Sequence, residues 1–391
     1  MRVLFVHEVG YFEKPIFEMH EFPEYLSKLG HEVAFLDMPE ERTKPRSFGK
    51  SQPGKTVPGS TLRLYSKPLV FKSTMGRLLT MVRYSKFFKA VIDDFQPEII
   101  VCLAVPTSGW QTLIVAQKSG IPFVFRALDV SHKIRRTMFA PLVKIAEGFI
   151  YRNADWVSCN NPAMLNYCLT MGAGVDSASV EFPPLKLSHF ASVQTKSSEL
   201  RAQFAIEENA RVIVYMGSFF YFSGLDVVLR NLSEVKEKPH LLLIGGGEQE
   251  KELRKLVEKL KLTGHVTFCG FVSYEELPTM LRVADIAINP MRPSLVAHTA
   301  LPNKVLQYMA SGMPVVTTNL RGLASLFELL PGLIFVRDSS QVLESAISLA
   351  TSPNLASSGE RNRDEVSKKF DVEGNVLAFE KLLLDVVRVN G

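Results

Sequence analysis

The chain has 391 residues, of which 46% are apolar and 22% are charged. This length exceeds one ordinary core of about 100–200 residues, and the composition excludes the disordered, collagen-like and coiled-coil classes, so we expect two globular domains. The four cysteines are scattered without a CxxC pair, and no run approaches the roughly 18 apolar residues of a membrane helix. These features predict a cytoplasmic protein without a disulfide framework or a zinc site.

The N-terminal half alternates short apolar runs with helix-like stretches. The runs are apolar throughout, which is typical of strands buried on both faces of a parallel sheet. The first run, Met1 to Val6, is too short for a signal sequence and leads directly into polar His7. The predicted strands are 2–6, 32–37, 98–104, 121–125 and 156–159.

A basic segment interrupts this alternation. From Arg42 to Lys89 the chain has twelve Lys or Arg and no Asp or Glu, whereas the rest has 33 basic against 40 acidic residues. Residues 44–60 have the composition of a surface loop, and residues 75–88 mix apolar and basic side chains as a basic amphipathic helix does. The segment is either a solvated surface or a binding surface for an anionic membrane or acceptor. The candidate contacts on a helix there are Arg77, Arg83, Lys86 and Lys89.

The C-terminal half repeats the alternation with greater regularity. Residues 186–205 follow two prolines, are rich in Ser, Thr, Lys and Gln, and form the predicted linker. Apolar runs followed by helix-like stretches come next, at 212–217, 240–245, 265–270, 285–290, 314–319 and 333–338. This order favours a doubly wound parallel sheet with right-handed crossovers.

We therefore predict an α/β chain with two Rossmann-like domains that face a cleft. The first domain spans 1–185 and the second spans 206–370. A C-terminal helix at 371–391 is expected to pack back toward the first domain. Ligands of such sheets bind at the carboxyl ends of the strands, so the cleft is the expected active site.

The stretch from Leu301 to Val316 predicts a ligand site in the second domain. Pro302 and Asn303 give a helix start, and Lys304 and Gln307 share one face of that helix. Since the opposite apolar face packs on the sheet, Lys304 and the free N–H groups of the first turn form a site for an anion. The alternative for Lys304 is an ordinary solvated lysine.

This stretch resembles the donor-binding motif of the family-4 glycosyltransferases, a retaining group with the GT-B fold. The order and spacing of several further segments carry the resemblance along most of the chain. It implies the GT-B fold, a nucleotide-sugar donor, a glycan or lipid-linked acceptor, and transfer with retention of configuration. The further segments are LSKLGHEV at 26–33, QPEIIV at 96–101, GIPFVF at 120–125, YMGSFFYFSGLDVVL at 215–229, LLIGGGEQEKELRKL at 242–256 and VTFCGFVSYEELPTMLRVADIAINP at 266–290.

The resemblance also implies a donor site, with departures from the family pattern. The family motif has two glutamates separated by seven residues, and this chain has Thr299 and Gln307 there. Gln307 can hydrogen-bond a sugar hydroxyl, more weakly than a carboxylate. Ser218 and Ser223 replace an Arg and a Lys that hold the diphosphate, whereas Lys304 fits a subgroup with a Pro-x-Lys motif. The implied donor-binding residues are Gly217, Ser218, Gly246, Val272, Asn303, Lys304 and Gln307.

In the N-terminal domain, the family places a His or an Asp after the fifth strand, near the acceptor and the sugar. The matching sequence, FRALDVSHKIRR at 125–136, offers Asp129 and His132 as catalytic candidates. Arg135 and Arg136 are candidates for an acceptor phosphate. Glu8 lies nearest to the position of the family's Gly-Gly turn. Each of these residues also has an ordinary role as a cap or turn residue.

The predicted chemistry is electrostatic, because a retaining transferase must stabilise an oxocarbenium-like sugar and a departing diphosphate. The chain has no Asp-x-Asp sequence, so we expect neither a metal nor a cofactor, and we expect no nucleic-acid partner. Two alternatives are a non-catalytic nucleotide-sugar-binding or scaffolding module and another GT-B enzyme such as a sugar-nucleotide epimerase. A tandem Rossmann dehydrogenase is disfavoured because no GxGxxG follows the first strand.

Overall fold

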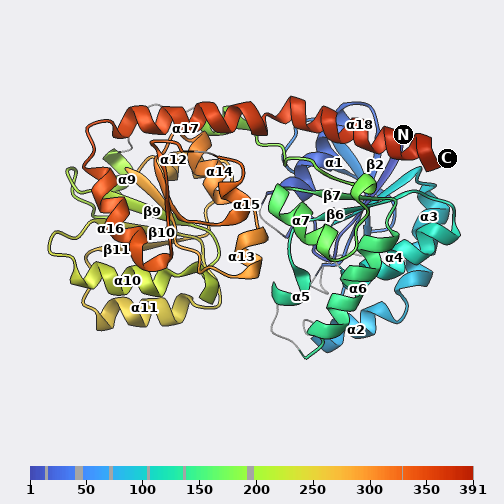
Figure 1. Ribbon diagram of the computed structural model, residues 1–391, viewed down its shortest axis with the longest axis horizontal. Coiled ribbons are helices and arrows are strands. Elements are labelled where there is room, and N and C mark those ends of the chain that lie inside the picture. The colour runs from blue at the N-terminus through green and yellow to red at the C-terminus, as the bar shows by residue number, and fades with distance from the viewer. Residues whose placement is uncertain are drawn as a thin grey trace. The chain divides into compact units, whose positions relative to one another are not determined.

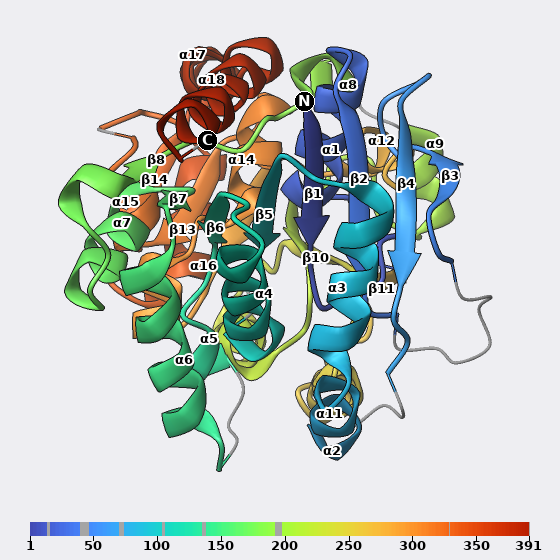
Figure 2. The ribbon, with the colours of Figure 1, turned by 90° about the vertical axis from the view of Figure 1, so that its right-hand side faces the viewer.

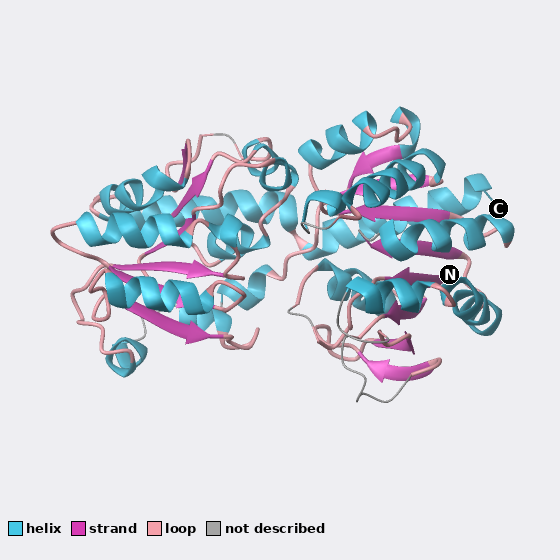
Figure 3. Cartoon of the chain, turned by 90° about the horizontal axis from the view of Figure 1, so that it is seen from below, coloured by secondary structure: helices cyan, strands magenta, loops and turns pink. Residues whose placement is uncertain are grey.

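The computed structural model describes residues 1–13, 16–39, 47–69, 74–103, 106–134, 138–191, 198–327 and 329–390. Over these ranges the chain folds into two compact α/β units (Figure 1). In each unit, helices pack against the strands of a mainly parallel sheet (Figure 3). The predicted fold class is therefore confirmed. Unit 1 comprises Met1–Pro184, Thr299–Leu301 and Val372–Gly391, and unit 2 comprises Leu185–His298 and Pro302–Asp371.

Unit 1 is built on a sheet of eight strands among the described residues (Figure 2). Their order is β3-β4-β2-β1-β5-β6-β7-β8, and the described pairs are parallel except for β3 with β4. Unbroken apolar runs form the central strands because side chains on both faces are buried. The strands are β1 (Arg2–Val6), β2 (Glu32–Asp37), β3 (Lys50–Pro53), β4 (Thr61–Ser66), β5 (Ile99–Leu103), β6 (Phe123–Ala127), β7 (Trp156–Cys159) and β8 (Ala178–Val180).

Two cores lie on the two faces of this sheet. On one face, Phe5 of β1 is in the same core as Phe22 and Phe379, whose rings are 4.3 Å apart. On the other face, Leu4 is in the same core as Phe88. The alternation of Leu4 and Phe5 follows from the two-residue period of a strand. The helices of unit 1 are α1 (Glu18–Lys28), α2 (Thr74–Met81), α3 (Tyr84–Phe95), α4 (Pro106–Lys118), α5 (Ser131–Ile134), α6 (Ala140–Asn153), α7 (Pro162–Thr170) and α18 (Val372–Asn390).

Unit 2 has a sheet of six described strands in the order β11-β10-β9-β12-β13-β14, and the described pairs are parallel. Its main core joins the strands to α10, α11 and α16. The strands are β9 (Val212–Met216), β10 (His240–Ile244), β11 (Val266–Gly270), β12 (Ile286–Asn289), β13 (Val315–Thr318) and β14 (Leu333–Val336). The helices are α8 (Leu187–Ala191), α9 (Ser198–Gln203), α10 (Leu225–Glu234), α11 (Glu250–Lys259), α12 (Leu277–Leu281), α13 (Leu295–Thr299), α14 (Asn303–Ala310), α15 (Arg321–Ala324), α16 (Ser339–Ala350) and α17 (Leu355–Phe370).

The described part of the basic segment contains more regular structure than a surface loop followed by one helix. Within 44–60, the described residues include β3, which pairs with β4 at the edge of the sheet. Within 75–88, two helices, α2 and α3, replace the expected single helix. The break directs Tyr84 into the core, where its hydroxyl lies 2.8 Å from the hydroxyl of Thr112. Burial of an aromatic side chain with a hydrogen-bonded hydroxyl favours this break.

A buried carboxylate holds residues 55–57 against α1. Glu24 is fully buried and accepts backbone N–H groups from Lys55 at 2.6 Å, Thr56 at 2.6 Å and Val57 at 2.7 Å. The hydroxyl of Tyr11 also donates to Glu24, at 2.5 Å. These charge-assisted hydrogen bonds compensate for removing the carboxylate from water.

Residues 186–205, the expected linker, contain α8 and α9, and the structure groups them with unit 2. Arg201 of α9 is buried and donates to the carbonyl groups of Val283, Glu208 and Ala210. The C-terminal helix α18 is part of unit 1, through the contact of Phe379 with Phe22. Over the described residues, no helix is both long enough and apolar enough to cross a bilayer.

Candidate functional site

In unit 2, glycines at the carboxyl ends of β9 and β10 bring two loops into direct backbone contact. Gly217 and Gly245 have φ angles of 133° and 120°, which favour glycine. A Cβ atom on Gly245 would lie 2.2 Å from the carbonyl oxygen of Gly217. The N–H of Phe219 donates to the carbonyl of Gly246 at 2.8 Å, so the two loops are also hydrogen-bonded. Glycines at these positions thus let the backbones of the two loops approach closely.

Lys304 lies beside this glycine pair. Its Nζ donates to the hydroxyl of Tyr215 at 2.9 Å and lies 4.3 Å from the centre of the Tyr215 ring. The Tyr215 hydroxyl in turn donates to the carbonyl of Ser218 at 3.0 Å. A Cβ atom on Gly217 would lie only 2.9 Å from Nζ. Tyr215 and the absence of a side chain at Gly217 therefore hold a half-buried ammonium group at the carboxyl end of β9.

The backbone N–H groups near Lys304 differ in whether they already donate a hydrogen bond within the protein. The N–H of Gly217 donates to the carbonyl of Ile244 at 2.9 Å, so it is already used within the sheet. The N–H of Ser218 has no acceptor among the described residues, and Ser218 is exposed. Gly217 therefore contributes space, whereas Ser218 contributes a free donor.

Helix α14 adds further donors at its beginning. Its N-cap is Pro302, so the N–H groups of Asn303 and Lys304 precede the first intrahelical hydrogen bond. The side-chain amides of Asn303 and Gln307 are partly exposed and have no hydrogen-bond partner among the described residues. Tyr308, on the buried face of α14, accepts the N–H of Met216 at 2.6 Å and so ties this helix to β9. Together these groups form a concentrated donor surface suited to an anion.

The other residues predicted to bind the nucleotide-sugar offer mainly backbone atoms. Gly246 is buried, and a Cβ atom there would lie 3.0 Å from the ring of Phe271. Val272 is half-buried in the loop after β11 and forms no hydrogen bond with the described residues. Ser223 is buried, and its hydroxyl donates to the carbonyl of Phe220 at 2.6 Å. Lys304 is therefore the cation that this edge presents beside the free N–H groups of α14.

In unit 1, Glu8 follows β1 and fixes the beginning of α4. Its carboxylate accepts the N–H of Ser108 at 2.5 Å and the hydroxyl of Thr107 at 3.0 Å. Glu8 is buried, and a negative charge at a helix N-terminus is stabilised by the helix dipole. This geometry assigns Glu8 a capping role in the structure.

Asp129 lies in the loop between β6 and α5, and its carboxylate has a different environment from that of Glu8. Its carboxylate has no hydrogen-bond partner among the described residues. Burial raises the pKa of Asp129 to about 6, and the negative charge of Glu18 contributes further. A carboxyl group without an internal partner and with a raised pKa is available to a ligand or to a transferred proton.

His132 of α5 is paired with a glutamate of α6 that the sequence did not single out. Its Nδ1 lies 2.5 Å from Oε2 of Glu147, and both side chains are buried. Glu147 also accepts the N–H of Ser131 at 2.7 Å, and the hydroxyl of Tyr167 lies 3.4 Å from Nδ1 of His132. Burial raises the pKa of Glu147, although its hydrogen bond with His132 opposes this effect. Glu147 thus fixes the orientation of the His132 ring.

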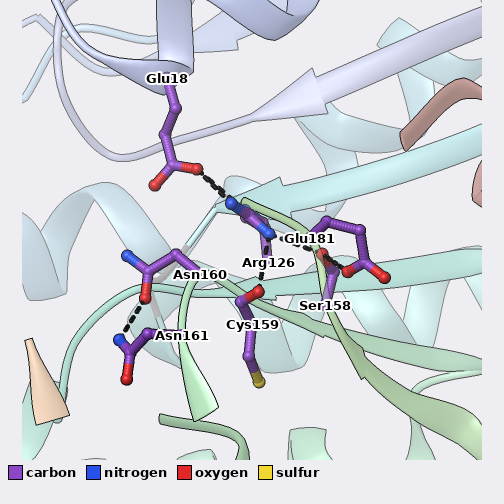
Figure 4. A network of polar contacts seen from close by, with 7 residues as sticks. All are labelled: Glu18, Arg126, Ser158, Cys159, Asn160, Asn161 and Glu181. Atoms are coloured by element: carbon purple, nitrogen blue, oxygen red, sulfur yellow. Dashed lines mark hydrogen bonds and ion pairs between the residues drawn. The ribbon is translucent and has the colours of Figure 1, made fainter. Parts of the chain in front are cut away.

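A buried polar network joins β6 and β7 in unit 1 (Figure 4). Arg126 of β6 donates to the carboxylate of Glu18 and, at 2.8 Å, to the hydroxyl of Ser158. The Ser158 hydroxyl donates to the carboxylate of Glu181. The buried guanidinium group is therefore bonded directly to Glu18 and linked through Ser158 to Glu181. The rings of Phe22 and Phe379 cover the guanidinium. The sequence signal for this network is an arginine within the otherwise apolar run FVFRA, a residue that the sequence analysis above does not name.

The predicted membrane and acceptor contacts are only partly within the described structure. Arg83, Lys86 and Lys89 are exposed at the beginning of α3, and Lys89 lies 3.5 Å from Asp93. Arg77 is in α2, but its side chain is outside the described part, as are Arg135 and Arg136. Over the described ranges, no three His, Cys, Asp or Glu side chains are grouped as metal ligands.

Comparison with known proteins identifies the kind of protein that carries these sites. A family model described as "Glycosyl transferases group 1" matches residues 196–363, and a "Glycosyl transferase 4-like domain" matches residues 19–185. A putative colanic acid biosynthesis glycosyl transferase, WcaI, of Escherichia coli (strain K12) is 24% identical over 327 residues, which are 76% of this chain and 78% of the relative.

Solved structures share the fold at low sequence identity. Sucrose-phosphate synthase from Thermosynechococcus elongatus superposes with a TM-score of 0.82 at 18% identity, over 99% of each chain. HepE of Anabaena, in complex with UDP-glucose, superposes with a TM-score of 0.76 at 16% identity, over 98% of this chain and 100% of that protein. The matching family models together span most of both units, and the chain therefore belongs to the glycosyltransferases with the GT-B fold.

Proposed function

We propose that this chain is a retaining, metal-independent glycosyltransferase that moves a sugar from a nucleotide-sugar to a glycan or lipid-linked acceptor. Unit 2 binds the donor, and unit 1 supplies the acceptor side. The observation that carries the proposal is the position of Lys304, which is held by Tyr215 beside the free N–H groups of α14. An ammonium group and helix amides stabilise the charge that develops on a departing diphosphate.

The roles of the other residues follow from their chemistry. Gln307 and Asn303 offer free amide groups for the ribose or sugar hydroxyls, and Ser218 offers a backbone N–H. In unit 1, the carboxyl group of Asp129 has no hydrogen-bond partner among the described residues, and His132 is held by Glu147. We assign these two residues to the acceptor and the transferred sugar. Glu8 supports this side by fixing α4.

The acceptor is proposed to be anionic and presented at a membrane surface. Arg83, Lys86 and Lys89 are exposed in the segment that contains no acidic residue between Arg42 and Lys89. Each basic residue near an anionic surface contributes roughly 1 kcal/mol. Replacing all three with Gln should weaken salt-sensitive binding to anionic vesicles, as measured by flotation. Unchanged flotation together with unchanged activity would remove this part of the proposal.

A panel of nucleotide-sugars tests the donor proposal directly. UDP-glucose is included because HepE, which has the same fold, is known in complex with it. Calorimetry measures binding, and slow hydrolysis of the donor measures turnover without a known acceptor. Binding with hydrolysis supports the transferase. Binding without any turnover on acceptors would favour a binding module, consistent with the absence of the two motif carboxylates at Thr299 and Gln307.

A further inference from the structure

An exposed apolar stripe at the beginning of α6 has no role in the sites described above. Met138, Leu142 and Ile145 form this α6 stripe, with exposed fractions of 86%, 63% and 66%. Leu142 and Ile145 are three residues apart in α6 and so share one side of the helix, and Met138 lies two residues before the helix begins, whereas Ile150 and Tyr151 are buried in the core of unit 1. Single exposed apolar side chains are common, but a helical stripe of large ones usually marks a contact surface.

The charges that flank the stripe in the sequence are of one sign. From Val130 to Ala146 the chain has four Lys or Arg and no Asp or Glu. Lys133 and Lys144 are exposed in the described structure of α5 and α6. A second copy of this chain would bring like charges together, whereas an anionic lipid surface would complement them. An apolar stripe flanked by lysines is the pattern of an interfacial helix.

The stripe lies at the end of unit 1 that carries the candidate acceptor residues. Figures 1 and 2 both place α2 and the beginning of α6 at the lower end of the unit, and the arrow of β1 points to that end in Figure 2. Between α2 and α3, Val82 provides a further exposed apolar side chain, with an exposed fraction of 77%. His132, in α5, lies six residues before Met138 in the chain.

We propose that the α6 stripe inserts into the headgroup and acyl boundary of an anionic lipid bilayer. Lys133 and Lys144 then face the headgroups, and the stripe supplies contact that salt does not screen. This inference deepens the membrane part of the proposed function, since it names the element that enters the lipid. A lipid-linked acceptor would thereby be presented near Asp129 and His132.

Vesicle flotation of paired variants tests the inference. Leu142→Ser with Ile145→Ser should lower partitioning onto phosphatidylcholine–phosphatidylglycerol vesicles roughly tenfold at high salt, because two apolar side chains no longer enter the lipid. The matched control is Leu377→Ser with Val389→Ser, which changes two exposed apolar residues of α18 and should leave partitioning unchanged. Equal partitioning of wild type and the α6 variant would overturn the inference.

Two further measurements separate the alternatives. In a Leu142→Trp variant, the emission should shift to shorter wavelength when anionic vesicles are added, and no shift would contradict insertion. Sedimentation velocity without lipid should show the same state for wild type and the α6 variant, and loss of an oligomer in the variant would assign the stripe to self-association instead. Vesicle binding is measured without any sugar donor. Its result therefore tests the membrane inference even if no transferase activity is found.

Discussion

Tyr215 determines what Lys304 can do, because the phenol is the lysine's hydrogen-bond partner. The ammonium group donates to the Tyr215 oxygen at 2.9 Å and also lies over the ring, at 4.3 Å from its centre. Its remaining N–H groups are then free for an incoming oxyanion. The Ser residues at 218 and 223 carry no charge, so neither adds a positive charge to that of Lys304.

Replacing Lys304 with Ala should reduce donor affinity and turnover by about 10²–10³-fold, since a donor aimed at developing charge is lost. Calorimetry with the bound nucleotide-sugar and kcat measurements check this prediction. Lys304→Arg should restore little, because a planar fork does not replace a point charge at the same place. Tyr215→Phe keeps the ring and should have a smaller effect. Activity of Lys304→Ala within about twofold of wild type would show that the lysine is an ordinary surface residue.

Asp129 gives a prediction with a defined pH dependence. Its pKa is about 6 in the folded chain against an ordinary 3.8, so the folded state favours the protonated acid. The group therefore contributes most to stability below pH 4, and this contribution is lost as the pH rises toward 6. Asp129→Asn should raise the free energy of unfolding above pH 7 by up to about 3 kcal/mol, with little change at pH 4.

Denaturant unfolding of Asp129→Asn and of wild type, at pH 4 and above pH 7, measures this difference in the free energy of unfolding. Turnover should fall in the same variant if the carboxyl group acts on the sugar or the acceptor, because active-site residues often cost stability. A loss of stability at pH 8 would mean that the carboxylate has a stabilising partner in solution.

Among the elements of unit 1, α1 supplies a carboxylate that anchors the edge of the sheet. Glu24 holds the three N–H groups of residues 55–57, and the hydroxyl of Thr56 donates to it at 2.8 Å. Glu24→Gln places an amide NH₂ against these donors. We expect it to lower the free energy of unfolding by about 2–4 kcal/mol, as measured by denaturant titration.

Glu21 is the matched control, one turn earlier on the same helix. Burial, with the charges of Glu18 and Glu24, raises the pKa of Glu21 to about 8. Since Glu21 is mostly protonated at pH 7, Glu21→Gln removes little charge and should be nearly neutral there. An equal loss in both variants would show that Glu24 matters only through packing.

The strands were predictable where they are buried and apolar, and not where they lie at an edge. The runs that became β1 and β9 are apolar at nearly every position, which only strands covered on both faces tolerate. In contrast, β3 reads KSQP and is exposed, so its pairing with β4 has no signal in its own composition. The turn between α2 and α3 depends on the burial of Tyr84, a tertiary contact that periodicity does not contain.

The candidate site was predictable only where its signals are local in the sequence. Lys304 stands out in the sequence because a helix start and a polar face coincide there, and the structure indeed places it at the end of β9. Its partner Tyr215 lies 89 residues earlier, and Glu147 lies 15 residues after His132. Such pairs arise from folding over long separations, so a single sequence does not identify them. The catalytic roles themselves stay predictions.

The two negative charges of a nucleotide-sugar diphosphate need balancing charge or dipoles on the protein. Glycosyltransferases that rely on a metal need carboxylates to hold it, and this chain has no Asp-x-Asp sequence. The alternative balance is Lys304 with the amides of Ser218, Asn303 and Lys304, which together present a cation and several dipoles.

Transfer and donor hydrolysis should therefore survive removal of divalent cations by EDTA, within about twofold of the untreated enzyme. The control is Lys304→Ala, in which added magnesium should not restore activity, because the described part of the chain holds no cluster of carboxylates for the ion. Complete loss in EDTA that magnesium or manganese restores would refute metal independence. Restoration of Lys304→Ala by magnesium would show instead that a bound ion can replace the lysine's charge, and would contradict the expected lack of a metal site beside the phosphates.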